Sequence, residues 1–302
     1  MHKSVLLDES IEYLNIKEDS IIVDCTLGYA GHSSEILKRI PRGHLYSFDQ
    51  DSEAIEYSKK KLEEVSNNFT IINSNFVNIK EELNKRGITK VDGILYDLGV
   101  SSPQLDEDYR GFSFHKEAKL DMRMNRKQAL SAYNVVNEYT ESELTDIIFK
   151  YGEEKFAKRI AASIVKNRPI NTTLELVEII KSAVPMKYKK DHHPARKTFQ
   201  AIRIEVNNEL EVFEKSLTDA LDLLNTDGRI CVITFHSLED KICKKVFRSV
   251  STVKEELKAL PVIPKKFEPK YKLVKTLSPS NKEIENNSRA RSAKLRVIKR
   301  ID

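Results

Sequence analysis

The stretch from Ile21 to Ser33 constrains the fold of this chain more than any other feature of its sequence. It starts with a β-branched apolar run that ends at Asp24, which is typical of a strand buried on both faces of a parallel sheet. Two glycines follow in a short loop, where the backbone can approach a ligand closely. Ser33 or Ser34 is expected to cap the next helix. This order predicts the ligand-binding corner of a doubly wound α/β sheet.

Further apolar runs predict the rest of the sheet. We expect strands at residues 44–48, 69–72, 91–97, 229–235 and 294–298. The run at 44–48 leads into Asp49, about 20 residues after the glycine loop, where a Rossmann-like fold carries the acid that binds ribose hydroxyls. Asp49 could instead cap the helix expected at 52–65, a role that Asp51 serves equally well. A helix at 5–14 is expected to pack against the sheet edge.

The alternation of strands and helices stops after the loop that follows Asp97. Between residues 106 and 206 the apolar residues have helical spacing, and no segment there is predicted as a strand. So long a helical stretch between two strands predicts an inserted domain, because ordinary connections are far shorter. We therefore expect a mainly parallel α/β domain at 1–105 and 207–302 and an inserted all-helical domain at 106–206. One helix is expected at 199–224.

Charge and cysteine content narrow the class of protein. The formal net charge is only +5, and the basic excess lies mainly at 254–275 and 289–300. This fits a phosphate-rich partner, with a solvated lysine-rich surface as the alternative. Cys25, Cys231 and Cys243 are too few and too far apart for a disulfide framework or a zinc site, so no metal is expected. Without a membrane-length apolar run or a signal peptide, a cytoplasmic protein with no membrane association is expected.

The crevice at the carboxyl ends of the strands lacks two common ligand signatures. There is no Walker motif, and the dinucleotide fingerprint is incomplete because no third glycine follows the loop. These absences favour a nucleoside cofactor without a pyrophosphate, and S-adenosylmethionine suits the remaining features. Phe76, after the third strand, could lie against an adenine or pack in the core. A hydrolase using His236 and Asp97 is a further alternative.

Short motifs along nearly the whole chain resemble one bacterial enzyme family, the methyltransferases that modify the N4 amine of a cytidine in 16S rRNA. The matching segments are 2–7, 24–33, 97–104, 110–114, 120–124, 151–154, 198–204, 235–240 and 289–296. The resemblance implies a class I, Rossmann-like methyltransferase fold with an inserted helical domain that helps to hold RNA. It also implies that the target is the decoding-centre cytidine, which receives a 2′-O-methyl group from another enzyme. The expected partner is 16S rRNA in the small ribosomal subunit, and a homodimer is left open.

The same resemblance implies the residues that contact S-adenosylmethionine. They are Ala30, Gly31, His32, Asp49, Phe76, Asp97 and Gln104. Relatives usually carry Gly-Gly before His-Ser, whereas this chain carries Ala30 and Gly31. Ala30 at a positive φ would strain the loop.

Methyl transfer to N4 needs an acceptor for the amine hydrogens, because the lone pair of N4 is delocalised into the cytosine ring. We expect Asp97, or a backbone carbonyl of its loop, to supply it; alternatively, Asp97 contacts only the methionine amine of the cofactor. His236 is the second candidate, as a proton acceptor or stacking partner, or else as a structural histidine at a strand end. Phe112, Phe114 or Phe235 could stack on the target base or lie in the core.

Basic residues of the insert and of the C-terminal segment are expected to contact RNA phosphates. They are Arg110, Arg123, Arg196, Arg203, Arg289, Arg291 and Arg296. Two other classes of protein stay open on this sequence. One is a methyltransferase for small molecules or proteins, and the other is an RNA-binding module without catalysis.

Overall fold

The computed structural model describes residues 4–100, 104, 107–191, 193–253, 255–257 and 264–302. The chain divides into two compact units, one formed by residues 1–99 and 210–302 and the other by residues 100–209. The insert expected at 106–206 is a few residues shorter than the second unit. The boundary expected at 105 and 106, and part of the basic stretch at 254–275, lie outside the described residues.

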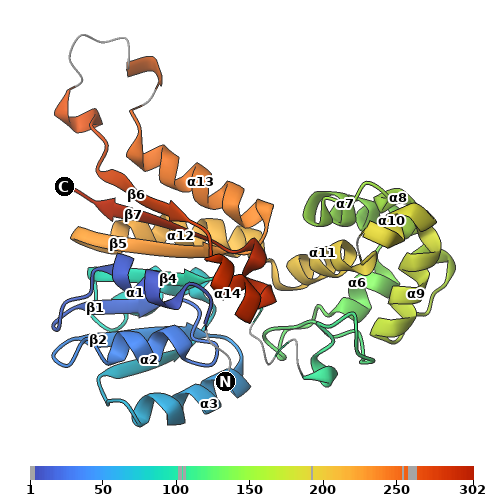
Figure 1. Cartoon of the computed structure of the whole chain (residues 1–302), viewed down its shortest axis with the longest axis horizontal. Coiled ribbons are helices and arrows are strands. Elements are labelled where there is room, and N and C mark those ends of the chain that lie inside the picture. Colours follow the sequence, from blue (N-terminus) through green and yellow to red (C-terminus); the bar gives the residue numbers. More distant parts are fainter. Residues whose placement is uncertain (1–3, 101–103, 105–106, 192, 254, 258–263) are drawn as a thin grey trace. The chain divides into compact units, whose positions relative to one another are not determined.

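The first unit is built around a seven-stranded sheet. Its strands are β1 Ile21–Asp24, β2 His44–Asp49, β3 Phe69–Asn73, β4 Val91–Asp97, β5 Leu224–Thr234, β6 Tyr271–Leu277 and β7 Lys294–Arg300. They lie in the order β3-β2-β1-β4-β5-β7-β6 (Figure 1). The first five pair in parallel, and β7 is antiparallel to both β5 and β6. The expected mainly parallel sheet is therefore confirmed.

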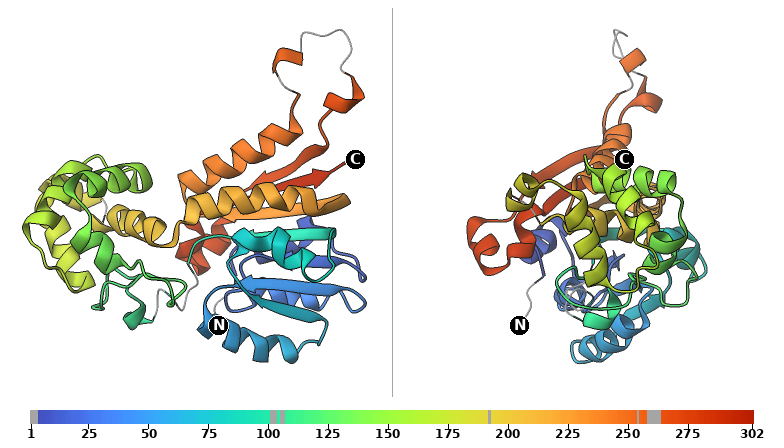
Figure 2. Two further views of the ribbon diagram at one scale, coloured as in Figure 1. Left: turned by 180° about the vertical axis from the view of Figure 1, so that it is seen from behind. Right: turned by 90° about the vertical axis from the view of Figure 1, so that its right-hand side faces the viewer.

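Helices cover both faces of this sheet, which is why its central strands are mainly apolar. One face packs on α1 (Leu7–Leu14), α2 (Gly31–Leu37) and α3 (Ser52–Glu63). The other face packs on α4 (Ile79–Asn84), α12 (Glu209–Leu223) and α13 (Ser237–Ser251). These helices face the viewer in the left-hand view of Figure 2. The three cysteines are buried and unpaired, as expected for small core residues. No helix in the described ranges is both long and apolar enough to cross a bilayer.

Helix α1 does not pack against an edge strand, so that expectation is wrong. It contacts β4 and β5 in the middle of the sheet. Its buried residues Ile11 and Leu14 belong to the same apolar cluster as Leu95 of β4 and Ile233 of β5. On this face of the sheet, α2 and α3 contact β1, β2 and β3. Helix α1 therefore covers the apolar side chains of the neighbouring strands β4 and β5.

Two expectations about the C-terminal half are also corrected. The helix expected at 199–224 is divided between α11 (Ala195–Asn207) and α12, because Asn208 adopts a left-handed conformation with φ of 49° and ends α11. Strand β6 lies in a segment that the sequence predicts to be a basic loop, so this prediction is wrong. Tyr271 is the one residue of β6 that is buried, and most of its other side chains point to solvent, so apolar periodicity could not indicate it.

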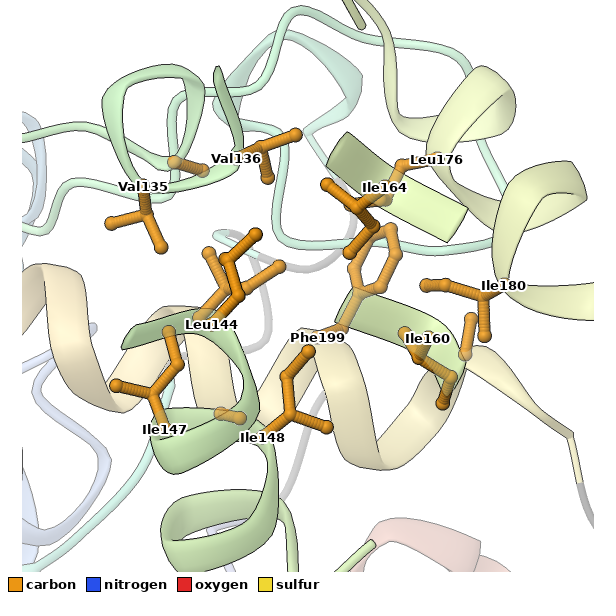
Figure 3. Close-up of a cluster of buried hydrophobic side chains, with 14 of the residues drawn as sticks. Val135, Val136, Leu144, Ile147, Ile148, Ile160, Ile164, Leu176, Ile180 and Phe199 are labelled. Carbon is orange, nitrogen blue, oxygen red and sulfur yellow. The ribbon is translucent and has the colours of Figure 1, made fainter. Parts of the chain in front are cut away.

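The second unit is helical, as expected. Besides α11 it contains α6 (Ala132–Glu138), α7 (Glu141–Gly152), α8 (Ala157–Lys166), α9 (Thr173–Ala183) and α10 (Met186–Asp191). The apolar stripes of α7, α8 and α9 meet in one buried cluster, into which Phe199 projects from α11 (Figure 3). Helices α7 and α9 start with capping boxes, Thr140 with Glu143 and Thr172 with Glu175, which satisfy the free N–H groups of their first turns.

Other short elements complete the description. Residues 107–131 of the second unit are largely irregular and include the 3₁₀ turn η2 (Asp108–Arg110). In the first unit, η1 (Phe76–Asn78) follows β3, and α14 (Asn281–Asn286) and η5 (Ser288–Ser292) precede β7. The 3₁₀ turns η3 (Glu255–Leu257) and η4 (Lys265–Phe267) lie between α13 and β6.

Candidate functional site

Three neighbouring strands of the first unit end in aspartates. Asp24 ends β1, Asp49 ends β2 and Asp97 ends β4, and these strands are adjacent and parallel in the sheet. The carboxyl ends of parallel strands meet at one edge, which is where open α/β sheets bind their ligands. The three carboxylates therefore gather at the ligand-binding edge of the sheet.

The loop between β1 and α2 has an unusual backbone. Gly28 and Ala30 both lie in the left-handed region, with φ of 48° and 56°. Asp49 Oδ2 accepts the Gly28 N–H at 2.9 Å, and Ser58 Oγ donates to the Gly28 carbonyl at 2.6 Å. A Cβ at Gly31 would lie 1.9 Å from Ser4 Oγ, so no larger residue fits there without movement. The loop is thus fixed by its neighbours in a shape that costs Ala30 conformational energy.

The serines expected to cap α2 lie inside that helix, so the capping expectation is wrong. The helix starts at Gly31 after Ala30, whose side chain has no oxygen with which to cap. Ser34 Oγ donates to the Ala30 carbonyl at 2.5 Å. Ser33 Oγ donates to Asp24 Oδ2 at 2.7 Å. Because the left-handed Ala30 starts the helix before either serine, the two hydroxyls bind Asp24 and the Ala30 carbonyl and cap no helix.

Asp24 is missing from the residues expected in the site, although it organises the loop. It is 1% exposed and accepts hydrogen bonds from Ser33 Oγ, from the Thr26 N–H at 3.0 Å and from Thr26 Oγ1 at 3.3 Å. Thr26 Oγ1 in turn accepts the Asp97 N–H at 2.7 Å, which connects the ends of β1 and β4. Burial raises the pKa of Asp24, and these hydrogen bonds oppose the rise. A carboxylate that ends a buried strand is a sequence signal that could have identified it.

Asp49 and Asp51 have different roles. Asp51 is the N-cap of α3 and accepts the Glu53 N–H at 3.1 Å. Asp49 instead accepts the N–H groups of Gly28 and of Asp51, the latter at 2.9 Å. Burial raises the pKa of Asp49 to about 7, despite these hydrogen bonds. Asp49 is therefore not the helix cap, while its expected contact with a ribose stays a prediction.

Asp97 and His32 lie side by side. His32 Nδ1 is 3.5 Å from Asp97 Oδ2, and burial lowers the pKa of His32 to about 4, so this imidazole is neutral at pH 7. Burial, followed by the negative charges of Asp24 and Glu239, raises the pKa of Asp97 well above its usual value. Asp97 Oδ1 is buried and has no hydrogen-bond partner among the described residues. The site thus contains a basic carboxylate with a free acceptor oxygen.

His236 is the N-cap of α13. Its Nδ1 accepts the Glu239 N–H at 3.4 Å, and its Nε2 lies 3.1 Å from Glu239 Oε1. Glu239 Oε2 accepts the N–H groups of Phe235 and His236 at 2.7 and 3.2 Å. These contacts form a capping box and give His236 a structural function at the strand end. A part for His236 in the chemistry stays a prediction.

The aromatic candidates are mostly packed. Phe76 is half-buried at the start of η1, with its ring edge-to-face against Tyr96 at 5.7 Å. In the second unit, Phe112 is 5% exposed and lies in the core cluster, so its face is not available for stacking. Phe114 stacks on His193 at 4.5 Å. Phe235 is half-buried in the first unit.

Gln104 belongs to the second unit and is buried. Its expected contact with the cofactor stays a prediction.

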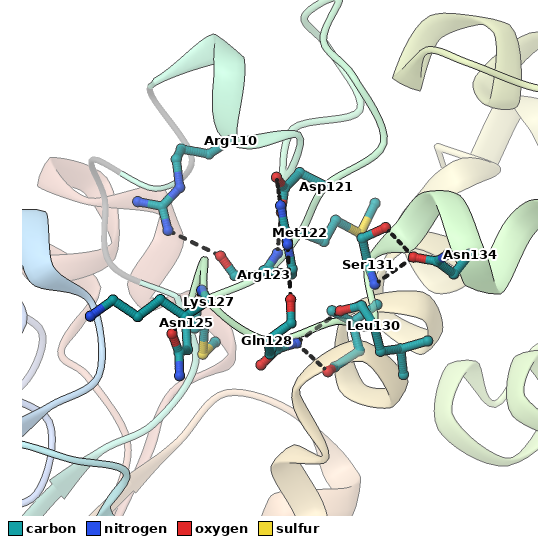
Figure 4. Close-up of polar contacts among 12 residues, drawn as sticks. Arg110, Asp121, Met122, Arg123, Asn125, Lys127, Gln128, Leu130, Ser131 and Asn134 are labelled. Atoms are coloured by element: carbon teal, nitrogen blue, oxygen red, sulfur yellow. Dashed lines mark hydrogen bonds and ion pairs between the residues drawn. The ribbon is translucent and has the colours of Figure 1, made fainter.

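Several arginines expected to contact RNA form contacts inside the protein. Arg203 makes a bidentate pair with Glu209, at 2.8 and 2.9 Å. Arg123 pairs with Asp121 at 2.8 and 2.9 Å, and the buried Arg110 donates to the Arg123 carbonyl at 3.1 Å (Figure 4).

In the first unit, Arg296 Nε donates to Asp240 at 2.6 Å. Arg196, Arg289 and Arg291 are exposed. The phosphate contacts expected of these arginines stay predictions.

The sheet order, the glycine loop after β1 and the acids that end β1, β2 and β4 define a class I methyltransferase that uses S-adenosylmethionine. The chain belongs to the MraW methylase family, whose model matches residues 1–301.

Relatives match along nearly the whole chain. A protein of Exiguobacterium sibiricum, named ribosomal RNA small subunit methyltransferase H, is 55% identical over 99% of this chain and 98% of its own length. A protein of the same name from Mycoplasma capricolum subsp. capricolum is 57% identical over 99% of both. The solved structure of an rRNA methylase from Streptococcus thermophilus matches 100% of this chain and 99% of that chain, with 11% identity and a TM-score of 0.42.

Proposed function

We propose that this protein transfers a methyl group from S-adenosylmethionine to the N4 amine of the decoding-centre cytidine of 16S rRNA, the cytidine that also carries a 2′-O-methyl group. The family and the name of the relatives, ribosomal RNA small subunit methyltransferase H, support the substrate class. The observation that carries the proposal is the edge formed by Asp24, Asp49 and Asp97, because it offers acceptors to a cationic cofactor and to an amine nucleophile.

The residues at this edge fit the cofactor. S-adenosylmethionine supplies an electrophilic methyl group when it is bound, and its sulfonium and ammonium charges are favoured beside carboxylates. Asp49 would accept hydrogen bonds from its ribose hydroxyls, and Phe76 would lie against its adenine. The loop at residues 30–32 would hold its methionine part, with Gln104 as a further contact. Asp97 Oδ1 is buried and has no hydrogen-bond partner in the part of the chain that the structure describes, which supports this assignment because a buried acceptor requires a donor.

Asp97 is our proposed acceptor for the N4 hydrogens. Burial and two neighbouring carboxylates raise its pKa, which makes it a stronger base than a solvated aspartate. His32 is neutral at pH 7, so it can orient Asp97 without adding a positive charge near the reacting groups. His236 is the second candidate for this role. Most of the rate enhancement would come from aligning N4 with the activated methyl group.

RNA would be held by the helical second unit and by the basic C-terminal segment. Arg196, Arg289 and Arg291 are exposed and suit contacts with phosphates. Assembly as a homodimer and a cytoplasmic location stay predictions.

Mass mapping of 16S rRNA tests the function directly. In cells that lack this protein, the fragment containing the decoding-centre cytidine should be lighter by one methyl group. Treating small subunits from those cells with purified protein and S-adenosylmethionine should restore that mass. An unchanged fragment, or activity on free nucleosides or peptides and none on small subunits, would contradict the proposal. A protein without catalysis would show no thermal shift with S-adenosylmethionine.

A further inference from the structure

The second unit carries a group of cations and aromatic rings where α7 connects to α8. Lys155 Nζ lies 5.1 Å from the centre of the Phe156 ring and 5.2 Å from that of Tyr188. The guanidinium of Arg159 lies 6.0 Å from the Phe156 ring, and the two rings meet edge-to-face at 5.1 Å. Lys155 and Arg159 are exposed, whereas both rings are half-buried. We call these four residues the 155–188 surface.

A buried carboxylate holds the two rings in place. Glu154 is 0% exposed; its Oε1 accepts the Phe156 N–H at 2.9 Å, and its Oε2 accepts the Tyr188 hydroxyl at 2.5 Å. The preceding residue, Glu153, has a φ of 48° and ends α7, so the chain turns sharply before it enters α8. The rings are therefore positioned before any partner arrives, which lowers the entropic cost of binding.

The cations of this surface are not committed to acids within the protein. Lys155 and Arg159 have no ion pair among the described residues, unlike Arg123 and Arg203. No Asp or Glu occurs from Lys155 to Arg168, a stretch that also contains Lys158 and Lys166. This stretch of chain is thus positively charged, and a polyanion that binds it would displace the solvent ions around its cations.

Cations interleaved with aromatic faces are the chemistry that binds single-stranded nucleic acid, in which bases stack on rings and phosphates meet Lys or Arg. Exposed cation–π contacts are weak, so Lys155 and Arg159 can move to phosphates and leave the rings to bases. We propose that the 155–188 surface binds a single-stranded segment of small-subunit rRNA during methylation. This inference rests on the proposed function and adds the place on the second unit where the substrate is held.

The test compares two double variants of identical composition. Lys155→Gln with Arg159→Gln removes the cations of the 155–188 surface. Lys85→Gln with Arg86→Gln, the control, removes a lysine and an arginine that pair with Glu81 and Glu82 at the end of α4 in the first unit. Methyl transfer to small subunits and binding of an rRNA fragment that spans the target are measured between low and high salt.

The first variant should raise the KM for rRNA about tenfold and reduce the salt slope of binding by about 1.4, since each contact with a single strand contributes about 0.7. Its kcat and its affinity for S-adenosylmethionine should stay those of the wild type, and the control should match the wild type throughout. Phe156→Leu should weaken binding of the fragment with little change in salt slope, because it removes stacking and no charge. The exchange of Lys155→Arg with Arg159→Lys should restore the salt slope.

Several results would overturn the inference while leaving the proposed function intact. One is that the wild-type enzyme methylates rRNA while the variant Lys155→Gln with Arg159→Gln has an unchanged KM for rRNA and an unchanged salt slope of binding. Another is a defect on assembled subunits with normal binding of the naked fragment, which would assign the surface to a ribosomal protein. A lower melting temperature that the charge-preserving exchange does not repair would indicate a structural role. If the wild type fails to methylate rRNA, the proposed function itself is wrong.

Discussion

The Gly28 N–H donates to the Asp49 carboxylate at 2.9 Å, which connects the end of β2 to the loop that follows β1. This bond places the acid expected to bind ribose directly against the loop expected to hold the methionine part. One hydrogen bond therefore couples the two ends of the proposed cofactor site. Burial in this arrangement raises the pKa of Asp49 to about 7, so the protonation of one side chain affects both parts.

Cofactor affinity should consequently depend on pH near neutrality. Ionised Asp49 can accept ribose hydroxyl hydrogens on both oxygens, whereas the protonated form loses one acceptor. Below its pKa of about 7, affinity for S-adenosylmethionine should fall towards tenfold per pH unit and should level off above it. Titration calorimetry from about pH 5.5 to 8.5 measures this. Asp49→Asn should bind more weakly and show no such dependence; a flat profile in the wild type contradicts the prediction.

The stability of the free protein should have the opposite pH dependence. The folded pKa of Asp49 lies above its unfolded value, so its favourable contribution is complete below about pH 4 and is lost as the pH rises through about 7. Asn cannot ionise, so Asp49→Asn removes this loss of stability with rising pH. Relative to the wild type, the variant should gain stability as the pH rises from 5 to 8, by about 1.4 kcal/mol for each pH unit between pH 5 and the folded pKa of about 7. Urea unfolding at both pH values checks the sign.

Ala30 offers a test of backbone strain. Its φ of 56° costs an alanine about 1–2 kcal/mol, which glycine avoids. Ala30→Gly also frees the unfolded chain and removes a buried methyl group, each costing about 0.5–1 kcal/mol. These effects nearly cancel, so the free energy of unfolding should change by less than about 1 kcal/mol. Ala30→Val should lose more than about 2 kcal/mol, because a β-branched residue tolerates this φ poorly. Equal losses in both variants would argue against strain.

Asp97→Asn separates the two roles open to this residue. If Asp97 accepts from N4, kcat should fall by about 10²–10⁴ while affinity for S-adenosylmethionine changes little. If Asp97 holds only the methionine ammonium, affinity should fall and kcat at saturating cofactor should persist. Single-turnover methylation of small subunits, combined with calorimetry, distinguishes these outcomes. Full methyl transfer with unchanged affinity would rule out both roles.

Arg203 should matter more for stability than for RNA binding. Its side chain is 16% exposed, and its guanidinium makes a bidentate pair with Glu209. Removing one partner leaves a largely buried charge, so Arg203→Gln should lower the free energy of unfolding by about 2–4 kcal/mol. Glu209→Gln should have a similar effect, and the double variant should lose less than the sum. A stable Arg203→Gln protein with weaker RNA binding would restore the expected phosphate contact.

Much of the first unit could be predicted from the sequence because its signals are local. The apolar run before Asp24 and the runs before Asp49 and Asp97 each specify a strand and place a carboxylate at its end. Helical spacing indicated α7, α8 and α9 for the same reason, since an amphipathic stripe is visible within a few turns of chain. Element type and the acidic edge were therefore determined by neighbouring residues alone.

Tertiary structure decided what depends on partners far away in the chain. Strand β6 exists because β7 pairs with it, although its own side chains are mostly exposed. The positive φ of Ala30 depends on the packing of the loop between β1 and α2, where Ala30 is fully buried, and no local pattern encodes it. The sequence at residues 21–33 thus predicts a ligand-binding loop. Only contacts made in the folded protein, such as the hydrogen bond between Gly28 and Asp49, determine its strained shape, and burial in the fold raises the pKa of Asp49.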